Sequence, residues 1–381
     1  MQRQMPGRPW QVRQTALEID LALLRKNYQR LLRRARGAEL LALMKSDAYG
    51  HSHREVAGAL ESLPANARLH GYGVANVEEG IELRRAGVKR PVYVLSGIQH
   101  YDVELHRCLE TVDLIPVVSS LRVLTMLADT LAVENGERTV HLKFNTGMNR
   151  LGIDPGEAKA CLKILKACPA IRVQGLMSHF AAGELPQSAI SKSQVKEFRS
   201  LLKVFREHGV EPRYVHMANS SGLASQLFPE GNLARVGLHL YGLDDPELSP
   251  VARWTAQVYQ VRELKKGQGV GYGPHFRAKK NMRMAVLGVG YADGYRRAFS
   301  NKAEVLLKGK RCRVIGAISM DLTTVDVSGV PSVTPRDRAV LLGKDGREQI
   351  TAGELAQHGK SISWEILTGI SSRVPRVFLN G

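Results

Sequence analysis

The strongest constraint on the fold is a regular alternation of short apolar runs and amphipathic stretches between residues 20 and 242. Apolar runs bounded by turn residues predict buried strands, and amphipathic stretches with a period of about 3.6 residues predict helices. Helical patterns occupy, for example, residues 21–36, 77–86, 191–208 and 221–227. The eight predicted strands end near Lys45, Ala75, Gly97, Ser119, Asn145, His179, Asn219 and Tyr241.

Eight such alternations favour one α/β architecture, a closed (β/α)8 barrel of the TIM type. A doubly wound open sheet is the alternative. An open sheet rarely needs eight strands in regular alternation without a glycine-rich first turn, and the chain has no G-x-G-x-x-G motif. The closed barrel is therefore the predicted fold.

Beyond residue 248 the pattern changes. Segments 254–262, 284–289, 303–307 and 311–318 read as strands, and glycine-containing turns join them. We predict a barrel that binds a cofactor at residues 15–247, followed by a mostly β C-terminal domain at residues 248–381. Residues 1–14 are predicted to pack on that C-terminal domain.

The net charge of the 381-residue chain is +18. Nucleic-acid binding is one explanation, but the basic residues are dispersed and form no single tract with interleaved aromatic residues. A generally basic surface, or a pocket for an anionic ligand, is favoured instead.

The sequence also predicts a cytoplasmic protein. No apolar run approaches the roughly 20 residues that span a membrane, and the N-terminal stretch lacks the apolar core of a signal peptide. The four cysteines, at positions 108, 161, 168 and 312, show no C-x-x-C spacing, so neither a metal site nor a disulfide is expected.

Lys45 is the first candidate for chemistry. The apolar run 40–44 predicts a buried strand that ends directly on this lysine. An amine at the mouth of a buried strand is poorly solvated, so its pKa falls and it becomes a usable nucleophile for an aldehyde cofactor. A surface lysine that simply ends a strand is the alternative, and this segment alone favours it.

The residues at the other strand ends favour the catalytic explanation of Lys45 over the surface-lysine explanation. In a β/α barrel the chemistry lies at the C-terminal ends of the strands. Loops near the seventh and eighth strands of such barrels often hold a phosphate, and segment 234–242 is the candidate here. Backbone N–H groups at Gly237 and Leu238 could approach an anion closely. Ser220 could add a hydroxyl donor. Singly these residues also suit a helix cap and a barrel bend, but together with a strand-end lysine they suggest pyridoxal 5′-phosphate.

Several ordered motifs then carry a resemblance. They are Met44–His51 (MKSDAYGH), Asn145–Gly152 (NTGMNRLG), Met177–Ala181, His216–Ser220, Arg235–Leu238, Gly271–Gly273, Gly290–Gly294, Ser319–Asp321 and Trp364–Leu367. The chain resembles the alanine racemase family, whose members combine a pyridoxal-phosphate-binding barrel of fold type III with a β domain. The resemblance runs from about residue 15 to residue 378. Each motif is weakly specific, but their common order and spacing are strongly specific.

The resemblance implies a cytoplasmic homodimeric isomerase with shared active sites. It would make D-alanine for peptidoglycan by Lys/Tyr proton transfer on a pyridoxal-phosphate aldimine. Lys45 and Tyr272 would be the two catalytic bases, the tyrosine coming from the partner subunit. Arg150 and Met320 would bind the substrate. The implied cofactor contacts are Lys45, Tyr49, His179, Ser220, Arg235, Gly237, Leu238 and Trp364, and the implied supporting residues are Lys143, Asp321 and Tyr291.

One departure from the family pattern concerns Trp364. The family usually has a tyrosine there, whose hydroxyl donates to the cofactor phosphate and whose ring narrows the pocket mouth. Tryptophan has only an indole N–H and a larger ring, so phosphate contact and substrate size are both affected.

Other functions stay open at the sequence level. A broader racemase acting on serine or basic amino acids would share most of these motifs. A decarboxylase of the same two-domain plan would share Lys45 but need not pair it with Tyr272. A noncatalytic carrier of the cofactor would lack the second domain.

Overall fold

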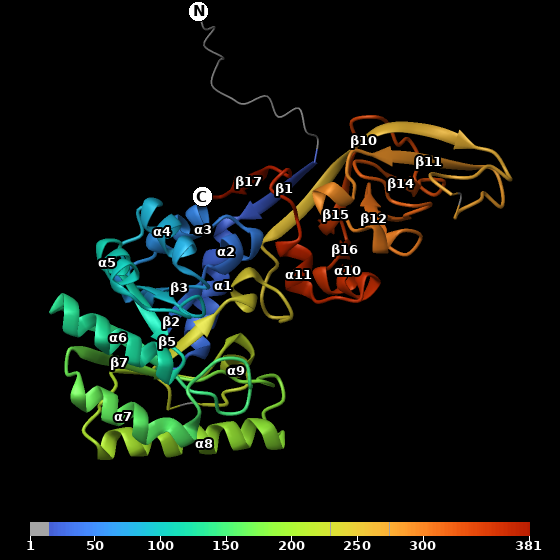
Figure 1. The fold of residues 1–381 in the computed structure, drawn as a ribbon. Coiled ribbons are helices and arrows are strands. Elements are labelled where there is room, and N and C mark those ends of the chain that lie inside the picture. The colour runs from blue at the N-terminus through green and yellow to red at the C-terminus, as the bar shows by residue number, and fades with distance from the viewer. Residues whose placement is uncertain (1–14, 229, 274) are drawn as a thin grey trace, which may run out of the picture. The chain divides into compact units, whose positions relative to one another are not determined.

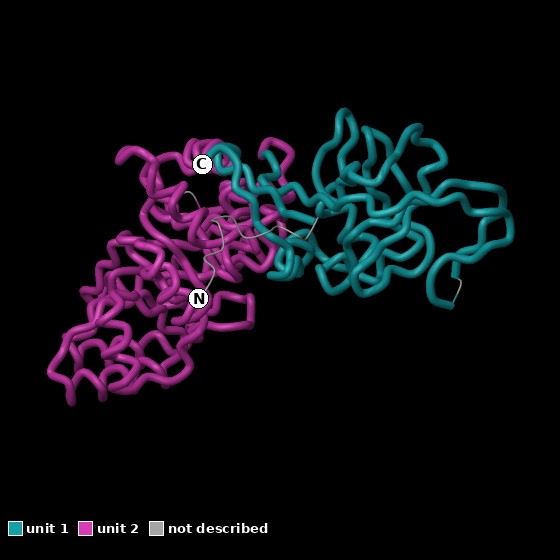
Figure 2. Tube along the Cα trace, turned by 90° about the horizontal axis from the view of Figure 1, so that it is seen from above, with its two compact units in different colours: residues 1–23, 249–381 teal, residues 24–248 magenta. Residues whose placement is uncertain are grey.

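The computed structural model describes residues 15–228, 230–273 and 275–381. These residues form two compact units, which Figure 2 distinguishes by colour. One unit comprises residues 24–248. The other combines residues 15–23 with residues 249–381.

The first unit is built on an eight-stranded sheet in the order β8-β7-β6-β5-β4-β3-β2-β9. Its strands are β2 (Glu39–Leu43), β3 (Leu69–Val74), β4 (Val92–Val94), β5 (Leu114–Val118), β6 (Arg138–Lys143), β7 (Ile171–Met177), β8 (Tyr214–His216) and β9 (Leu233–Val236). Every neighbouring pair is parallel. The Arg235 N–H donates to the Ala218 carbonyl at 3.0 Å, which brings the two end strands together. The predicted barrel is thus confirmed as a near-closed one.

Helices surround these strands (Figure 1). They are α1 (Leu21–Arg34), α3 (His53–Glu61), α4 (Val77–Arg85), α5 (Val103–Thr111), α6 (Leu121–Glu134), α7 (Ala158–Ala167), α8 (Ala189–Glu207) and α9 (Ser220–Ala224). Short polar side chains begin several of them: the side chains of Asn76, Asp102 and Ser120 each accept a hydrogen bond from a backbone N–H of the first turn. In α8 the buried residues recur every three or four positions, so one apolar face packs on the barrel.

The eighth strand is shorter than predicted. It ends at Val236, whereas the sequence placed its end near Tyr241. Gly237 leaves the extended conformation with φ −126° and ψ −86°, and residues Leu238–Tyr241 form a 3-10 turn, η3. The Tyr241 side chain then turns back, and its hydroxyl donates to the Leu43 carbonyl at 2.8 Å.

The second unit is mostly β, as predicted. Its nine-stranded sheet follows the path β13-β12-β15-β10-β1-β17, with β11, β14 and β16 attached beside it. The strands are β1 (Thr15–Asp20), β10 (Ala252–Leu264), β11 (Met282–Leu287), β12 (Glu304–Leu307), β13 (Lys310–Arg313), β14 (Thr323–Asp326), β15 (Arg338–Asp345), β16 (Glu348–Ile350) and β17 (Arg376–Leu379). Two helices follow β16, α10 (Ala352–Gly359) and α11 (Ser363–Thr368).

The boundary between the units differs from the predicted one. The sequence assigned residues 15–23 to the barrel, but β1 pairs antiparallel with β10 and parallel with β17. Long-range pairing of this kind leaves no local signal. The predicted packing of residues 1–14 lies outside the described residues. Within the described ranges, no helix has the length and apolar character needed to cross a membrane.

Candidate active site

Lys45 opens an unusual turn at the end of β2. Residues 46–49 have φ values between 52° and 56°, so α2 (Lys45–Gly50) contains a left-handed turn made without glycine. Left-handed helical backbone costs about 1–2 kcal/mol per L-residue, and such strain persists only where the surroundings impose it. Tyr241 contributes to those surroundings: its ring stacks on His51 at a centroid distance of 4.5 Å.

The Lys45 amine lies in a partly desolvated, cationic environment. Its Nζ is 5.6 Å from the centroid of the Tyr49 ring. The pKa of Lys45 is lowered, first because the amine is buried and then because Arg150 is nearby, while Glu79 opposes the shift. The structure therefore supports the sequence argument for a nucleophilic strand-end amine rather than the surface lysine that was its alternative.

Arg235 on β9 is almost fully buried, with 1% of its surface exposed. Nη1 donates to Nδ1 and the carbonyl of His216, at 2.9 and 3.1 Å. Nη2 donates to the Ser178 carbonyl at 2.8 Å, to His179 Nδ1 at 3.1 Å and to the Met217 carbonyl at 3.1 Å. The Nε–H takes part in none of these bonds, so it remains as a donor for a ligand.

This guanidinium keeps two histidines neutral. Arginine can only donate, so the Nδ1 atoms of His179 and His216 must accept and each ring carries its proton on Nε2. Burial and then the charge of Arg235 lower the pKa of His179 to about 2 and that of His216 well below its usual value. Burial lowers the pKa of Arg235 itself to about 9, which still leaves it cationic at neutral pH.

Three of the predicted phosphate residues come together beside the turn. Ser220, at the start of α9, accepts a hydrogen bond from the Gly237 N–H at 3.0 Å. A Cβ at Gly237 would lie 2.4 Å from the Tyr49 hydroxyl, so only glycine lets this backbone approach the tyrosine. Leu238 follows at the start of η3.

The barrel site concentrates positive charge. Lys143 ends β6 with 5% of its surface exposed. Burial, followed by the charges of Arg235, Arg150 and Lys45, lowers its pKa to about 8. Such a cluster suits an anionic ligand. A phosphate would meet Ser220 and the backbone at Gly237. An aldehyde would meet the Lys45 amine, and a pyridine nitrogen would meet the free Nε–H of Arg235. The residues therefore fit pyridoxal 5′-phosphate.

The remaining predicted residues belong to the second unit, where most are exposed. Tyr272 exposes 79% of its surface and Met320 exposes 53%. Tyr291 and Trp364 are also exposed. The Tyr291 N–H donates to the Ser319 carbonyl at 3.0 Å, which joins two of these loops.

Asp321 follows Met320 in the same loop. It accepts a hydrogen bond from Arg373 Nη2 at 2.6 Å, which ties this loop to the segment that precedes β17. The predicted residues are thus divided between the two units, with the cofactor and lysine residues in the barrel unit and Tyr272, Tyr291, Met320, Asp321 and Trp364 in the second unit.

Sequence reasoning missed Glu79 as part of the barrel site. Its carboxylate accepts from the backbone N–H groups of Ser46 and Ala75, both at 2.7 Å, and so ties the Lys45 turn to the end of β3. An acidic residue in the first turn of a helix is ordinarily explained by the helix dipole, so nothing in the sequence marked it. His216 stood inside a quoted motif but received no role.

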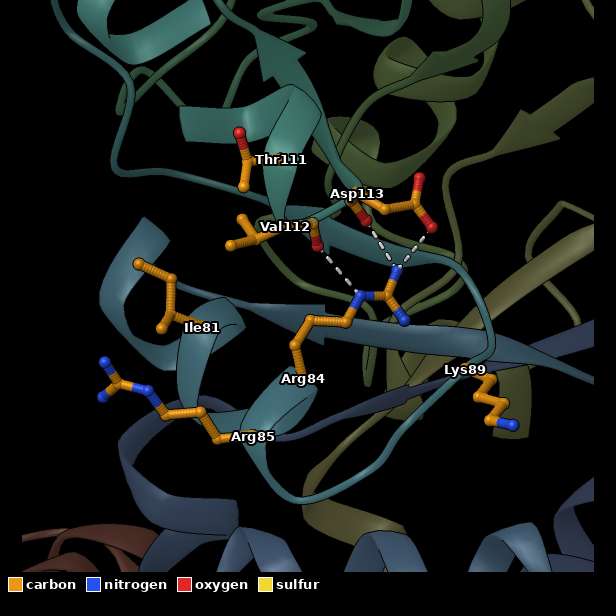
Figure 3. A pocket seen from close by; sticks show the side chains of 7 residues that line it. All are labelled: Ile81, Arg84, Arg85, Lys89, Thr111, Val112 and Asp113. Carbon is orange, nitrogen blue, oxygen red and sulfur yellow. Dashed lines mark hydrogen bonds and ion pairs between the residues drawn. The ribbon is translucent and has the colours of Figure 1, made fainter. Parts of the chain in front are cut away.

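A surface hollow lies beside α4 in the barrel unit (Figure 3). Arg84 lines it, but its guanidinium is bound to the carbonyls of Val112 and Asp113 and to the Asp113 carboxylate. Arg84 therefore fastens a loop, and none of the predicted site residues lines this hollow.

The barrel site has the features of a pyridoxal-phosphate-dependent enzyme: a desolvated lysine at a strand end, a buried arginine and a backbone cradle for an anion. Comparison with known proteins gives the family. The model of the alanine racemase N-terminal domain matches residues 19–245, and that of the C-terminal domain matches residues 251–378. The chain belongs to the alanine racemase family, and its activity is the pyridoxal-phosphate-dependent interconversion of L- and D-alanine.

Individual relatives agree over almost the whole chain. An alanine racemase of Geobacter sulfurreducens is 38% identical over 380 residues, covering 97% of this chain and 98% of the relative. The structure of alanine racemase from D-cycloserine-producing Streptomyces lavendulae has a TM-score of 0.88 at 32% identity, covering 97% of this chain and 98% of that one. Alanine racemase from Bartonella henselae, solved with covalently bound pyridoxal phosphate, has a TM-score of 0.85 at 26% identity, covering 96% and 99%.

Proposed function

We propose that the barrel residues divide the work of racemisation as follows. Lys45 bears the cofactor, and the free Nε–H of Arg235 faces the pyridine nitrogen. The cofactor, when bound, supplies the electron-withdrawing ring that acidifies the Cα–H of alanine. The observation that carries this proposal is that Arg235, although buried, uses only its two terminal nitrogens for the protein. Tyr49, Ser220, Gly237 and Leu238 hold the phosphate.

Two bases then act on opposite faces of Cα. The Lys45 amine exchanges a proton on one face and the Tyr272 hydroxyl on the other, because a single base would tend to return the proton to the face it came from. Arg150 binds the substrate carboxylate. His179, which carries its proton on Nε2, is the proposed neighbour of the Tyr272 hydroxyl.

Four further residues are proposed to support this pair of bases. Met320 contacts the substrate, with Tyr291 and Asp321 holding its loop. Lys143 positions Arg150. A pKa of about 8 makes a fraction of the Lys143 amine neutral at physiological pH, which is the form that carbon dioxide can carbamylate.

Tyr272 and Met320 are proposed to serve the partner's barrel in a homodimer. Both side chains are apolar or amphipathic and strongly exposed on the second unit, and Leu322, Ile362 and Trp364 are exposed there as well. Exposed apolar side chains in this number favour a protein interface.

The substrate range is the main question for direct assay. Purified protein supplied with pyridoxal phosphate should be incubated with a panel of L-amino acids and the products separated by chiral chromatography. D-Alanine should form fastest. Faster racemisation of serine, or of lysine or arginine, would instead favour a broader racemase, and release of amines would favour a decarboxylase.

Gly237→Ala should weaken cofactor binding. The new Cβ would meet the buried Tyr49 hydroxyl at 2.4 Å, so the ring or the phosphate cradle must shift. Overpacking costs roughly 1–3 kcal/mol, or about 5- to 150-fold in affinity if it is expressed wholly in binding. Titration of the apo-protein with cofactor measures this loss. Gly58→Ala is the matched control, because nothing lies within 4 Å of its added Cβ, and an equal loss there would contradict the cradle.

Trp364→Tyr should tighten cofactor binding. We propose that residue 364 borders the pocket mouth, where a tyrosine hydroxyl would restore a donor to the phosphate. A hydrogen bond to a charged group contributes roughly 1.5–3 kcal/mol, which is about 10- to 100-fold in affinity. The ratio of alanine to serine turnover should change with it. If affinity and ratio both stay at their wild-type values, Trp364 is a packing residue only.

We also propose a reducing, cytoplasmic setting. All four cysteines are free thiols. Burial raises the pKa of Cys161 and of Cys312 to about 12, so neither forms a thiolate readily at neutral pH.

A further inference from the structure

A connected row of polar side chains runs through the barrel from Arg235 to Glu39, at the opposite end of the strands. Six polar contacts at hydrogen-bonding distance connect its members, and all of them lie within the first unit. In order they are Arg235 Nη1–His216 Nδ1 (2.9 Å), His216 Nε2–His141 Nδ1 (2.8 Å), His141 Nε2–Gln174 Oε1 (3.3 Å), Gln174 Oε1–Tyr93 hydroxyl (3.2 Å), Tyr93 hydroxyl–His70 Nε2 (2.6 Å) and His70 Nδ1–Glu39 Oε2 (2.7 Å). We call this row of side chains the barrel relay.

Donor chemistry fixes the direction of the inner half of the relay. Arg235 can only donate, so His216 accepts on Nδ1 and donates from Nε2. His141 therefore accepts on Nδ1, and its own Nε2–H donates to the Gln174 carbonyl oxygen. Burial lowers the pKa of His141 to about 3, so it stays neutral and keeps this tautomer. The orientation of His216 against Arg235 thus depends on Gln174 Oε1, the acceptor that His216 reaches through His141.

Two local distortions of the strands build the relay. The pairing of β3 with β2 jumps from Leu69 to Gly71, so His70 is an extra residue, and the pairing of β7 with β6 skips Gln174 in the same way. A bulge of this kind re-aims a side chain that regular alternation would point elsewhere. Gly175 completes the arrangement, because a Cβ there would lie 2.5 Å from His141 Cε1.

The outer end of the relay can hold two hydrogen-bond patterns. When Glu39 is ionised it only accepts, so His70 Nδ1 carries a proton. If His70 is neutral, its Nε2 accepts from the Tyr93 hydroxyl. If His70 is protonated, Nε2 also donates, and the Tyr93 hydroxyl must donate to Gln174 instead. The charge on His70 therefore decides whether Gln174 Oε1 accepts one hydrogen bond or two.

Groups on several elements act on that charge. Burial lowers the pKa of His70, Glu39 raises it, and Arg213 and Arg90 lower it further. The groups that face His70 are Glu39 on β2, Tyr93 on β4, His141 on β6, Tyr214 on β8, and Arg90 and Arg213 just before β4 and β8. His70 is neutral at physiological pH as a result, and acidification switches the Tyr93 hydroxyl towards Gln174.

We propose that Glu39 and His70 are positioning residues for Arg235, acting through the barrel relay from the end of β2 opposite to Lys45. Lys45 lies six positions after Glu39, a span of roughly 20 Å in extended backbone. The proposal rests on the proposed contact of Arg235 with the cofactor ring. Through that contact, protonation of His70 changes the hydrogen bonding of the pyridine nitrogen without any group of the relay touching the substrate.

The test compares paired variants of the holoenzyme. Glu39→Gln removes the carboxylate of the relay, and Tyr93→Phe removes only the hydroxyl that joins its halves. Glu18→Gln and Tyr72→Phe are the matched controls. Glu18 pairs with Arg253 in the second unit, and the Tyr72 hydroxyl donates to Glu61 on α3 at 2.8 Å, so neither residue belongs to the relay. The readouts are the absorption spectrum of the bound cofactor from pH 5 to 9 and the 15N NMR signals of histidine-labelled protein.

In the wild type, the His70 transition should appear in both readouts. Glu39→Gln should move it to lower pH, because the Glu39 carboxylate stabilises the imidazolium form of His70. Tyr93→Phe should remove it from the cofactor spectrum and from the His141 signal, while both controls keep the wild-type curves. Glu39→Gln behaving like Glu18→Gln in both readouts would overturn the proposal. A response of His141 and His216 with an unchanged cofactor spectrum would support the relay and refute the assigned contact between Arg235 and the cofactor.

Discussion

Lys45→Ala should lose covalent attachment of the cofactor and at least about 10³-fold in racemisation rate, since it removes both a nucleophile and a general base. The absorption band of the protonated Schiff base should vanish. Borohydride should fix no cofactor to the variant, whereas it fixes one equivalent to the wild type. Lys163→Ala, which truncates a lysine exposed on α7, should retain the attached cofactor, the racemisation rate, the absorption band and the borohydride-fixed equivalent.

The pH dependence of reconstitution provides a second check on the same residue. Only the neutral amine attacks an aldehyde, so attachment to the apo-protein should speed up as the pH rises towards the pKa of Lys45. Burial and Arg150 lower that pKa, so the midpoint should fall below the value of about 10.4 that is usual for lysine. A reducible adduct in Lys45→Ala, or a midpoint at the usual lysine value, would contradict the assignment.

Local sequence predicted the barrel well because its signals are local. Each apolar run between turn residues became a strand, and the run ending at Lys45 became β2. The placement of β1 was not predictable in the same way. Its residues, Thr15–Asp20, are partnered by β10 and β17, more than 200 positions away in the chain. Nothing within the segment itself distinguishes a strand of the second unit from the first strand of a barrel.

The Lys45 turn shows a second limit of sequence reasoning. Ser46, Asp47, Ala48 and Tyr49 include no glycine, so local preference argues against a left-handed turn. Tertiary contacts impose it: the Tyr241 hydroxyl holds the Leu43 carbonyl, and Glu79 holds the Ser46 N–H. The sequence pointed to the reactive amine but contained no signal for the strained backbone that presents it.

The barrel relay was hidden for a related reason. His70 and Gln174 occupy positions that regular alternation assigns to the other face of their strands, and two bulges reverse that assignment. Bulges have no reliable sequence signature unless glycine marks them. Here glycine does follow each bulged residue, as Gly71 and Gly175, but in a strand this is equally well explained by close packing.

Mixing two inactive variants should restore activity if the sites are shared between subunits. Lys45→Ala removes the amine that a barrel supplies to its own site. Tyr272→Phe removes the hydroxyl that we assign to the partner's site. After random exchange, half of the dimers are mixed and each has one intact site, so about a quarter of the wild-type activity should return. Subunit exchange is followed independently by native mass spectrometry.

The decisive control uses the double variant Lys45→Ala/Tyr272→Phe mixed with wild-type protein. If each site takes Lys45 from one subunit and Tyr272 from the other, both sites of the mixed dimer are spoiled, and activity falls below that of the wild-type protein alone. If each chain instead supplies both residues to its own site, the wild-type chain keeps its activity in every dimer. The two arrangements thus give opposite results in both mixtures, because the arrangements differ only in which chain supplies Tyr272 to the site that contains Lys45.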